Sequence, residues 1–300
     1  MAYHRPVLLQ ESVEGLAIKP EGIYVDVTFG GGGHSTLIAS QLTTGHLYGF
    51  DQDTDAEQEA EKLNSSAFTF VKANFRYLKK YLRLHGVRQV DGILADLGVS
   101  SFQFDTSARG FSTRFDGPLD MRMDQQGSKT AQDILQTYAE EELHKMFGIY
   151  GEVKNARTLA RTIVLKRATQ ELATIGQFKQ AIASCMPKGK ENKYLAQVFQ
   201  ALRIEVNDEM KALEEMLLQT VEVLKPGGRL VVISYHSLED RLVKNFIGKG
   251  KFFGEVEKDF FGNEIKPLAA VYRKALTPSA LELQENNRSR SAKLRIAAKL

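Results

Sequence analysis

The amino-acid sequence predicts an α/β protein in which a mostly parallel sheet is interrupted by a helical insertion. Short apolar segments alternate with amphipathic segments over the first 98 residues, and the alternation returns after about residue 206. Between them, from about Ser101 to Val206, the segments are helical in character. Strands that alternate with helices form parallel, doubly wound sheets, so this order indicates one α/β domain split by an insertion of roughly 100 residues.

The first half of the α/β domain contains four expected strands and three expected helices. The strands are expected at 23–28, 46–51, 68–73 and 90–98, and the helices at 34–42, 54–63 and 75–84. The fourth strand, VDGILADLG, is apolar almost throughout, which is typical of a strand buried on both faces. At the start of the second helix, Thr54 and Glu57 fit a capping box.

The second half contains expected helices at 208–224 and 237–247, with a turn and a strand at 225–235 between them. In the C-terminal segment RSRSAKLRIAAKL, apolar Ala292, Leu294 and Ile296 alternate with basic residues. This period of two predicts a terminal strand with a basic outer face. The predicted domains are therefore an α/β domain formed by 1–104 and 207–300, and an inserted helical domain at 105–206.

Composition excludes several classes of protein. The single cysteine, Cys185, excludes an internal disulfide and a multi-cysteine metal site, and we expect it to be buried in a helix. No cluster with metal-ligand spacing is visible, so no metal site is predicted. The N-terminus lacks the apolar core of a signal peptide, and no apolar run approaches the roughly 20 residues that span a bilayer. We therefore expect a cytoplasmic protein.

A run of four glycines in TFGGGGHS, residues 28–35, follows the first expected strand. A dinucleotide site requires G-x-G-x-x-G, but the third glycine position falls on Ser35 or Thr36, depending on the register. A phosphate-binding P-loop requires a lysine, and the loop contains none. The loop therefore permits close approach of the backbone to a ligand without a clear phosphate signature.

Acidic residues lie at or near the ends of three expected strands. Asp26 precedes the glycine loop, Asp51 ends the second strand about 20 residues beyond it, and Asp96 lies near the end of the fourth. An acid in the position of Asp51 accepts hydrogen bonds from a ribose diol, and carboxylates stabilise a cation. S-adenosylmethionine, which has a ribose, a sulfonium and an ammonium group but no phosphate, fits this pattern. A nicotinamide site and a tight turn with solvated carboxylates are the alternatives.

Several longer segments resemble one known family. They are TFGGGGHS, DGILADLGVSS (91–101), ARGFS (108–112), FDGPLDMRMD (115–124), VFQALRIEVN (198–207), LKPGGRL (224–230), SYHSLEDR (234–241) and NNRSRSAKLR (286–295). The chain is similar over nearly its whole length to the bacterial 16S rRNA (cytosine-N4) methyltransferases of the RsmH/MraW family. The resemblance implies a Rossmann-like class I methyltransferase domain with an inserted helical domain for RNA recognition. It also implies methylation, with S-adenosylmethionine as cofactor, of one cytidine in the decoding region of the small ribosomal subunit.

The resemblance also implies individual site residues. The expected cofactor contacts are Gly32, Gly33, His34, Asp51, Phe75, Asp96 and Gln103. Phe102 stands where many relatives have proline, and Tyr235 stands where phenylalanine is common.

The catalytic group is harder to predict. The nitrogen lone pair of cytosine N4 is delocalised into the ring, so a group that accepts an N4 hydrogen assists attack. The Pro-Pro-aromatic motif of many amino-methyltransferases is absent after the fourth strand, where the sequence is DLGVSSFQF. Candidates are Asp96, a backbone carbonyl near Gly98, and SYHS, in which His236 either accepts a proton or fixes the turn between strand and helix. Phe102, Phe104 and Tyr235 either stack on the target base or pack in the core.

Two basic zones suggest contacts with RNA phosphates. Residues 152–193 contain nine Lys and Arg against three Glu, in a chain whose net charge is only +3. The candidates are Lys154, Arg157 and Arg161 on one expected helix, Lys188 and Lys190 in a loop, and Arg288, Arg290 and Lys293 near the C-terminus. The expected partner is 16S rRNA in the small ribosomal subunit. The alternatives are a methyltransferase of another substrate, a non-catalytic ribosome assembly factor, and solvated basic faces. The sequence does not determine the oligomeric state.

Overall fold

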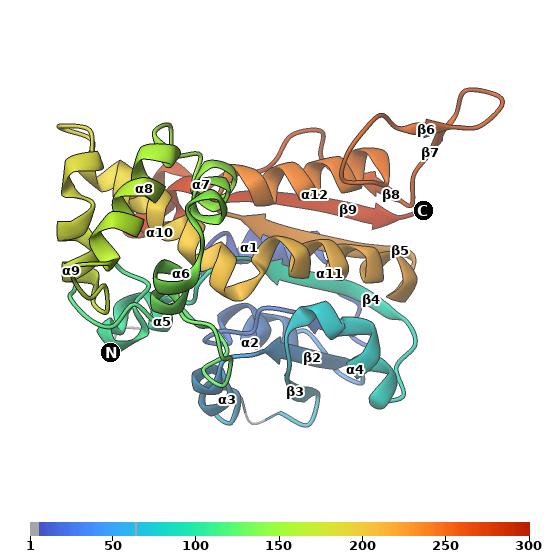
Figure 1. Ribbon diagram of the computed structural model, residues 1–300. Helices are drawn as coiled ribbons and strands as arrows, with labels where there is room; N and C mark the ends of the chain where they lie inside the picture. Colours follow the sequence, from blue (N-terminus) through green and yellow to red (C-terminus); the bar gives the residue numbers. More distant parts are fainter. Residues whose placement is uncertain (1–5, 64) are drawn as a thin grey trace. The chain divides into compact units, whose positions relative to one another are not determined.

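The computed structural model describes residues 6–63 and 65–300, and the chain divides into two compact units (Figure 1). The sheet unit comprises the chain up to Gly98 and from Met210 to Leu300. The helical unit comprises Val99–Glu209, compared with the predicted insertion at 105–206. None of the helices in the described ranges has both the length and the apolar character needed to cross a membrane.

The sheet unit is built on a seven-stranded sheet of order β3-β2-β1-β4-β5-β9-β8. Its parallel strands are β1 (Ile23–Asp26), β2 (His46–Asp51), β3 (Phe68–Lys72), β4 (Val90–Asp96) and β5 (Leu224–Ser234). Strand β9 (Lys293–Lys299) is antiparallel to β5 and to β8 (Leu268–Ala270). The strand order reverses between β1 and β4, and ligands bind at such a switch point, outside the carboxyl ends of the strands. The predicted mostly parallel α/β sheet is confirmed.

Helices cover both faces of the sheet. One core contains residues of α4 (Leu78–Leu84), α11 (Glu209–Val223) and α12 (Ser237–Lys249), and the other contains residues of α1 (Leu9–Gly15) and α2 (Gly33–Ala39). Strand β4 supplies both cores, because Ile93 packs in the first and Leu94 in the second. This two-sided burial explains why the segment is apolar almost throughout.

The other elements of the sheet unit lie around this framework. They are α3 (Thr54–Ala60), the 3₁₀ turns η1 (Phe75–Tyr77) and η4 (Asn287–Ser291), α13 (Ala280–Glu285), and a hairpin formed by β6 (Glu257–Lys258) and β7 (Glu264–Ile265). The predicted capping box at Thr54 is wrong, because Asp53 caps α3 and accepts a hydrogen bond from the Asp55 N–H at 3.0 Å.

The predicted terminal strand is confirmed as β9, with Leu294 and Ile296 buried. Its basic face is partly neutralised. Lys293 and Arg295 both pair with Asp240 of α12, at 3.0 Å and 2.7 Å.

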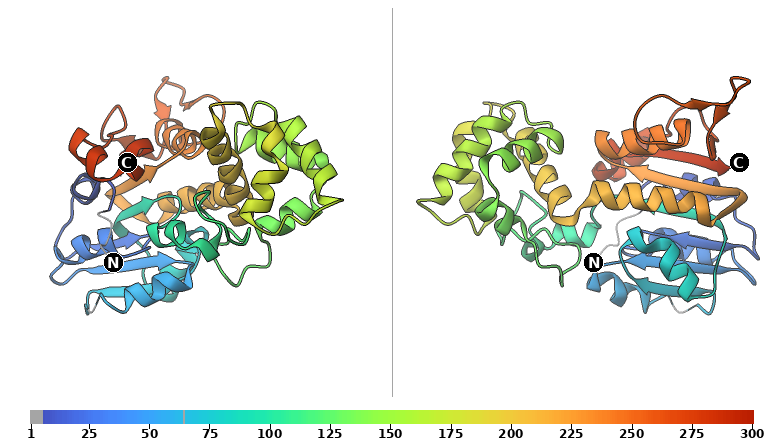
Figure 2. Two further views of the ribbon diagram at one scale, coloured as in Figure 1. Left: turned by 90° about the vertical axis from the view of Figure 1, so that its left-hand side faces the viewer. Right: turned by 45° about the vertical axis from the view of Figure 1, so that its right-hand side comes forward.

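The helical unit, whose helices are coloured green to yellow in Figure 2, has a core of its own, to which Phe147, Leu159, Phe178 and Leu202 contribute. Its elements are α5 (Ser101–Asp105), η2 (Ser107–Arg109), α6 (Ala131–Thr137), α7 (Glu140–Ile149), α8 (Ala156–Arg167), α9 (Ile175–Ala181), η3 (Ala183–Cys185) and α10 (Glu191–Asn207). Cys185 is buried, as predicted, but in a 3₁₀ turn.

Candidate active site

The glycine loop connects β1 to α2 at the switch point of the sheet. Gly30 and Gly32 have φ angles of 52° and 74°, a region that favours glycine. The Gly32 N–H donates to the Phe29 carbonyl at 2.8 Å. A Cβ atom at Gly32 would lie 2.7 Å from the Phe29 ring, and one at Gly33 would collide with Pro6. The glycines therefore allow a tight turn against neighbouring side chains.

Replacing Gly32 by alanine should destabilise the sheet unit and weaken cofactor binding. The left-handed backbone alone costs about 1–2 kcal/mol for an L-residue, and the clash with Phe29 adds to it. The matched control is Gly86→Ala, because Gly86 has a φ of 76° but no atom within 4 Å of an added Cβ. Thermal unfolding and calorimetry with S-adenosylmethionine should show the larger loss for Gly32→Ala. Equal losses in the two variants would contradict the packing argument.

Asp26, at the end of β1, accepts hydrogen bonds from the loop and from α2. One carboxylate oxygen accepts the Thr28 N–H at 3.1 Å, and the other accepts the Ser35 hydroxyl at 2.7 Å. The side chain is only 1% exposed, and burial raises the pKa of Asp26. Asp26 is therefore a structural acid of the site.

Asp51, at the end of β2, is directed towards the same loop. Its Oδ2 accepts the Gly30 N–H at 2.8 Å, and its Oδ1 accepts the Asp53 N–H at 2.9 Å. Burial raises the pKa of Asp51 to about 6. Since a carboxylate oxygen can accept more than one hydrogen bond, both oxygens keep capacity for the two hydroxyls of a ribose.

Asp96 ends β4 on the other side of the switch point. Its N–H donates to the Thr28 hydroxyl at 2.6 Å, and its Oδ1 accepts the Tyr235 hydroxyl at 2.8 Å. Its Oδ2 lies 3.8 Å from His34 Nδ1. Burial raises the pKa of Asp96 to about 6, although the side chain is still 24% exposed. Asp96 can therefore reach a ligand and accept a proton near neutral pH.

His34 and His236 are both held by neighbouring groups. His34 Nε2 lies 3.1 Å from the Val7 carbonyl oxygen, so this nitrogen carries hydrogen and donates. His236 caps α12, where its Nδ1 accepts the Glu239 N–H at 3.4 Å and its Nε2 lies 3.0 Å from Glu239 Oε1. This geometry gives His236 the role of fixing the strand-to-helix turn, and its use as a proton acceptor stays a prediction.

Phe75 and Gln103 belong to different units. Phe75 begins η1 in the sheet unit. The preceding residue, Asn74, donates its side-chain amide to Gln52 at 2.8 Å. Gln52 directly follows Asp51 in the sequence, so η1 starts near the end of β2. Gln103 is in the helical unit, where its side-chain oxygen accepts the Ser100 N–H at 3.0 Å and completes the capping box of α5. Both cofactor assignments stay predictions.

Sequence reasoning missed the contact of Tyr235 with Asp96. The roles predicted for Tyr235 were base stacking and core packing, whereas the Tyr235 hydroxyl is the hydrogen-bond donor to Asp96. The signal was available, because β4 and β5 are parallel neighbours with Asp96 opposite Ile233. Side chains just beyond Ile233 therefore reach the same edge of the sheet.

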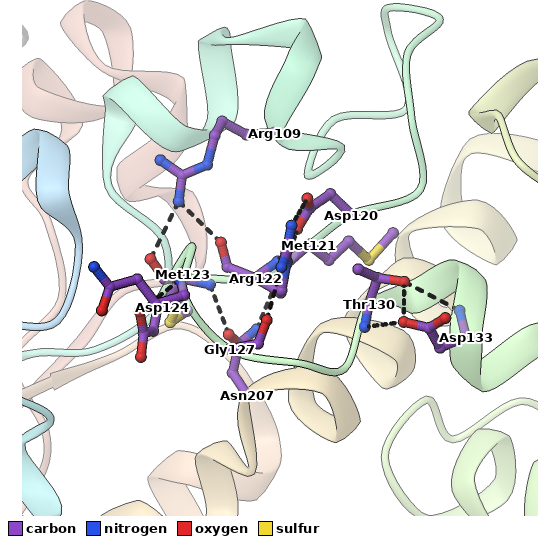
Figure 3. Close-up of polar contacts among 11 residues, drawn as sticks. Arg109, Asp120, Met121, Arg122, Met123, Asp124, Gly127, Thr130, Asp133 and Asn207 are labelled. Atoms are coloured by element: carbon purple, nitrogen blue, oxygen red, sulfur yellow. Dashed lines mark hydrogen bonds and ion pairs between the residues drawn. The ribbon is translucent and has the colours of Figure 1, made fainter.

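In the helical unit, residues of the motifs ARGFS, FDGPLDMRMD and VFQALRIEVN are joined by hydrogen bonds around one loop (Figure 3). Arg109 donates to the carbonyls of Arg122 and Met123 at 2.9 and 3.2 Å. Asn207, the last residue of VFQALRIEVN, donates to the Met121 carbonyl and accepts the Met123 N–H, both at 2.8 Å. Arg122 pairs with Asp120 and donates to the Gly127 carbonyl at 2.7 Å. These bonds fix the backbone around Met121, Arg122 and Met123, in the second half of FDGPLDMRMD.

Asn207→Ala should destabilise the helical unit by about 2 kcal/mol, because it leaves backbone groups of Met121 and Met123 without their partner. The matched control is Asn192→Ala, at an exposed position of the same helix. Chemical denaturation checks both. A loss for Asn192→Ala as large as that for Asn207→Ala would contradict the loop argument, because helix propensity alone favours alanine over asparagine.

The structure corrects the prediction that Lys154, Arg157 and Arg161 lie on one helix. Lys154 precedes α8, whose N-cap is Asn155, so only Arg157 and Arg161 of the expected stripe lie on the helix. The expectation of one helix carrying all three failed because the backbone before Ala156 forms a turn. The exposed members of the basic set are Lys154, Arg157, Arg161, Lys188, Lys190, Arg290 and Lys293, while Arg288 is half-buried. Their contacts with RNA stay predictions.

The chemistry of the site fits S-adenosylmethionine. Residues 23–40 contain no Lys or Arg, so the loop offers no side-chain cation to a phosphate. Asp51 offers acceptors suited to a ribose, and Asp96 offers a partly exposed carboxylate suited to a cation. Burial raises the pKa of both to about 6 and so disfavours their ionised forms. A positively charged ligand nearby would offset this effect by stabilising the ionised carboxylates.

Comparison with solved structures finds an rRNA methylase from Streptococcus thermophilus, 13% identical with a TM-score of 0.45, which covers 100% of this chain and 99% of that one. A putative methyltransferase from Streptococcus mutans in complex with SAH is 14% identical, also with a TM-score of 0.45, and covers 100% of both chains.

Curated relatives are much more similar. Ribosomal RNA small subunit methyltransferase H of Cytophaga hutchinsonii is 59% identical over 295 residues, 98% of this chain and 99% of that protein. The protein of the same name from Parabacteroides distasonis is 58% identical over 300 residues, with 99% and 98% covered. The model of the MraW methylase family matches residues 1–300. The predicted class I methyltransferase fold and S-adenosylmethionine as cofactor are thereby confirmed, and the chain belongs to the MraW methylase family.

Proposed function

We propose that this protein methylates N4 of one cytidine in the decoding region of 16S rRNA, within the small ribosomal subunit. The observation that carries the proposal is the partly exposed Asp96 carboxylate at the switch point, held by Tyr235 beside His34. The names of the relatives, ribosomal RNA small subunit methyltransferase H, support the class of RNA. A cytoplasmic location, where bacterial ribosomes are found, goes with this substrate.

The residues of the sheet unit would hold the cofactor in a defined way. Asp51 would accept hydrogen bonds from the ribose, while Gly32, Gly33 and Phe75 border it. When bound, S-adenosylmethionine supplies an electrophilic methyl group on a sulfonium centre. Gln103 of the helical unit is a further proposed contact.

Asp96 would act on the amine of the target cytosine. Its Oδ1 already accepts the Tyr235 hydroxyl, so Oδ2 is the oxygen that would accept an N4 hydrogen. That hydrogen bond would align the amine and direct its lone pair towards the methyl group, and alignment supplies much of the lowering of the barrier. With its pKa near 6, Asp96 is ionised at neutral pH and can take up the proton that N4 loses after methyl transfer.

The test is methyl transfer to isolated small subunits. The protein is incubated with labelled S-adenosylmethionine and small subunits from cells that lack the enzyme, and the nucleosides of the digested rRNA are identified. We expect label in N4-methylcytidine. Label in another nucleoside would overturn the cytosine-N4 assignment, and label in protein or a small molecule would indicate another substrate. Subunit binding without any transfer would favour a non-catalytic assembly factor.

A further inference from the structure

A basic segment of the sheet unit lies outside the basic zones described above, and of its residues only Phe75 belongs to the proposed cofactor site. Residues 62–90 contain seven Lys and Arg side chains and no Asp or Glu. Five of the seven lie within residues 75–88, interleaved with Tyr77 and Tyr81. This part forms η1 and α4 and then leads into β4. Positive charge and aromatic rings are therefore concentrated on one short stretch of the sequence, and Figure 1 shows the position of α4 in the sheet unit.

Two of the five cations have a structural role. Arg76 donates to Glu215 at 2.6 Å, and Lys79 pairs with Glu222. Gln219 adds to this contact, since it accepts the Lys79 N–H at 2.9 Å and donates to the Arg76 carbonyl at 2.7 Å. All three partners lie on α11. These bonds fasten η1 and α4 to the neighbouring helix.

The other three cations, Lys80, Arg83 and Arg88, have no such role. All three are exposed, and in the described parts of the chain, 6–63 and 65–300, no carboxylate pairs with them. Leu78 and Leu82 of α4 are buried in the core of the sheet unit and Tyr81 packs partly against it, while Lys80 and Arg83 lie on the exposed side of the helix. Lys80 and Arg83 lie three residues apart on this helix, a spacing at which like charges repel.

Tyrosine rings accompany these cations. Lys80 Nζ lies 5.8 Å from the centroid of the Tyr77 ring and 5.6 Å from that of Tyr81. Tyr77 is 49% exposed. Both distances are within the range of cation–π attraction, so ring and charge lie next to each other.

We propose that Tyr77, Lys80, Arg83 and Arg88, here called the α4 surface, bind a single-stranded segment of the substrate RNA. Cations without neighbouring acids match the phosphates of the backbone, and an exposed aromatic ring is a platform for a base. The inference rests on the proposed function and adds to it an RNA contact that belongs to the sheet unit itself. Binding of phosphates would also relieve the repulsion between the cations.

The test compares two triple variants with the same change in charge. The first is Lys80→Gln, Arg83→Gln, Arg88→Gln. The control is Lys258→Gln, Arg273→Gln, Lys274→Gln, which removes three exposed cations elsewhere in the sheet unit. Binding to protein-free rRNA from small subunits is measured at several salt concentrations. Calorimetry with S-adenosylmethionine verifies that both variants are folded.

The α4 variant should bind rRNA at least about tenfold more weakly near 0.15 M salt, and its slope of log K against log salt should fall by about 2, since each phosphate contact with a single strand contributes about 0.7. The control should resemble the wild-type protein. An unchanged slope, or an equal fall in the control, would overturn the proposal. Methyl transfer by the wild-type protein is scored separately, so failure of the proposed function is distinguished from failure of the α4 surface.

Variants of Tyr77 distinguish the contribution of base stacking to RNA binding from the contribution of charge. Tyr77→Ala should weaken rRNA binding about tenfold without changing the salt slope, and Tyr77→Phe, which keeps the ring, should restore binding. If Tyr77→Phe binds as weakly as Tyr77→Ala, the ring is not a platform for a base. If single-stranded DNA of the same sequence binds with equal affinity and equal dependence on the variants, the surface recognises any single-stranded nucleic acid, and the assignment to RNA fails.

Discussion

Asp96→Asn should lower the rate of methyl transfer by about 100-fold or more, because removal of a group that accepts a proton costs about that much. Asparagine retains the shape of the side chain and an oxygen for the Tyr235 hydroxyl, but it cannot take up a proton or stabilise a cation. Affinity for S-adenosylmethionine should fall as well. Single-turnover rates with small subunits and calorimetry with the cofactor check the two effects. A rate equal to that of the wild-type protein would remove Asp96 from catalysis.

The same substitution should stabilise the free protein above pH 6. Burial raises the pKa of Asp96 from its ordinary 3.8 to about 6, so between these values the folded state binds the proton more tightly than the unfolded state. The free energy of unfolding of the wild-type protein therefore falls as pH rises through this window. Asparagine avoids this loss, which is at most about 3 kcal/mol for two pH units and smaller for a side chain that is 24% exposed.

Asp91, on the same strand, is the matched control, because its pKa is shifted in the opposite direction from that of Asp96. Burial opposes its ionisation, but hydrogen bonds from Lys225 and from the Ile23 N–H hold the pKa of Asp91 below its ordinary value. Asp91→Asn should therefore destabilise the protein at neutral pH and have less effect in acid. Denaturation at pH 5 and pH 8 distinguishes the two variants. If Asp96→Asn also destabilises more at pH 8 than at pH 5, the linkage argument is wrong.

Asp51→Ala should weaken binding of S-adenosylmethionine by about 100-fold, while the affinity for rRNA changes little. Two hydrogen bonds from the ribose to a charged acceptor are worth about 3 kcal/mol together, and the Gly30 N–H also loses its acceptor. Because the pKa of Asp51 is also about 6, cofactor binding by the wild-type protein should weaken as pH falls below 6. Calorimetry at pH 5, 6 and 8 measures both effects.

The control for this variant is Asp53→Ala, two residues away. Asp53 caps α3 and accepts the Asp55 N–H at 3.0 Å, so its loss should cost about 1 kcal/mol of stability but leave cofactor affinity nearly unchanged. Equal loss of cofactor affinity in Asp51→Ala and Asp53→Ala would show that the loop needs both acids for its shape, and that neither is specific to the ribose.

The sequence alone was sufficient for the framework of the sheet unit. The strand at 46–51 was predicted with the bounds of β2, and the apolar segment at 90–98 contains β4. Such strands are buried on both faces and bounded by turns, so their pattern is local and visible in a single sequence. The placement of Asp26, Asp51 and Asp96 at one edge followed from the parallel topology, because parallel strands end on the same side of a sheet.

Contacts between distant parts of the chain were decided only by the tertiary structure. The bond from Tyr235 to Asp96 joins residues 139 positions apart, and the Val7 carbonyl fixes His34 across 27 positions. Asn207 bonds to a loop 84 and 86 positions earlier. No local pattern contains these pairs, since they depend on which strand ends and helix ends the packed core brings together.

For the basic segment 62–90, too, the sequence determines one part and the tertiary structure the other. The sequence determines that residues 62–90 carry seven cations and no acid, but only the folded chain decides which of them remain available. Glu215 and Glu222 neutralise Arg76 and Lys79 from a helix more than 130 residues later. Composition and periodicity therefore determined the fold class, the strand-end acids and the surplus of charge. The tertiary structure determined which acid is held in place by which partner and which cations face solvent, because both depend on the ion pairs and hydrogen bonds that packing completes.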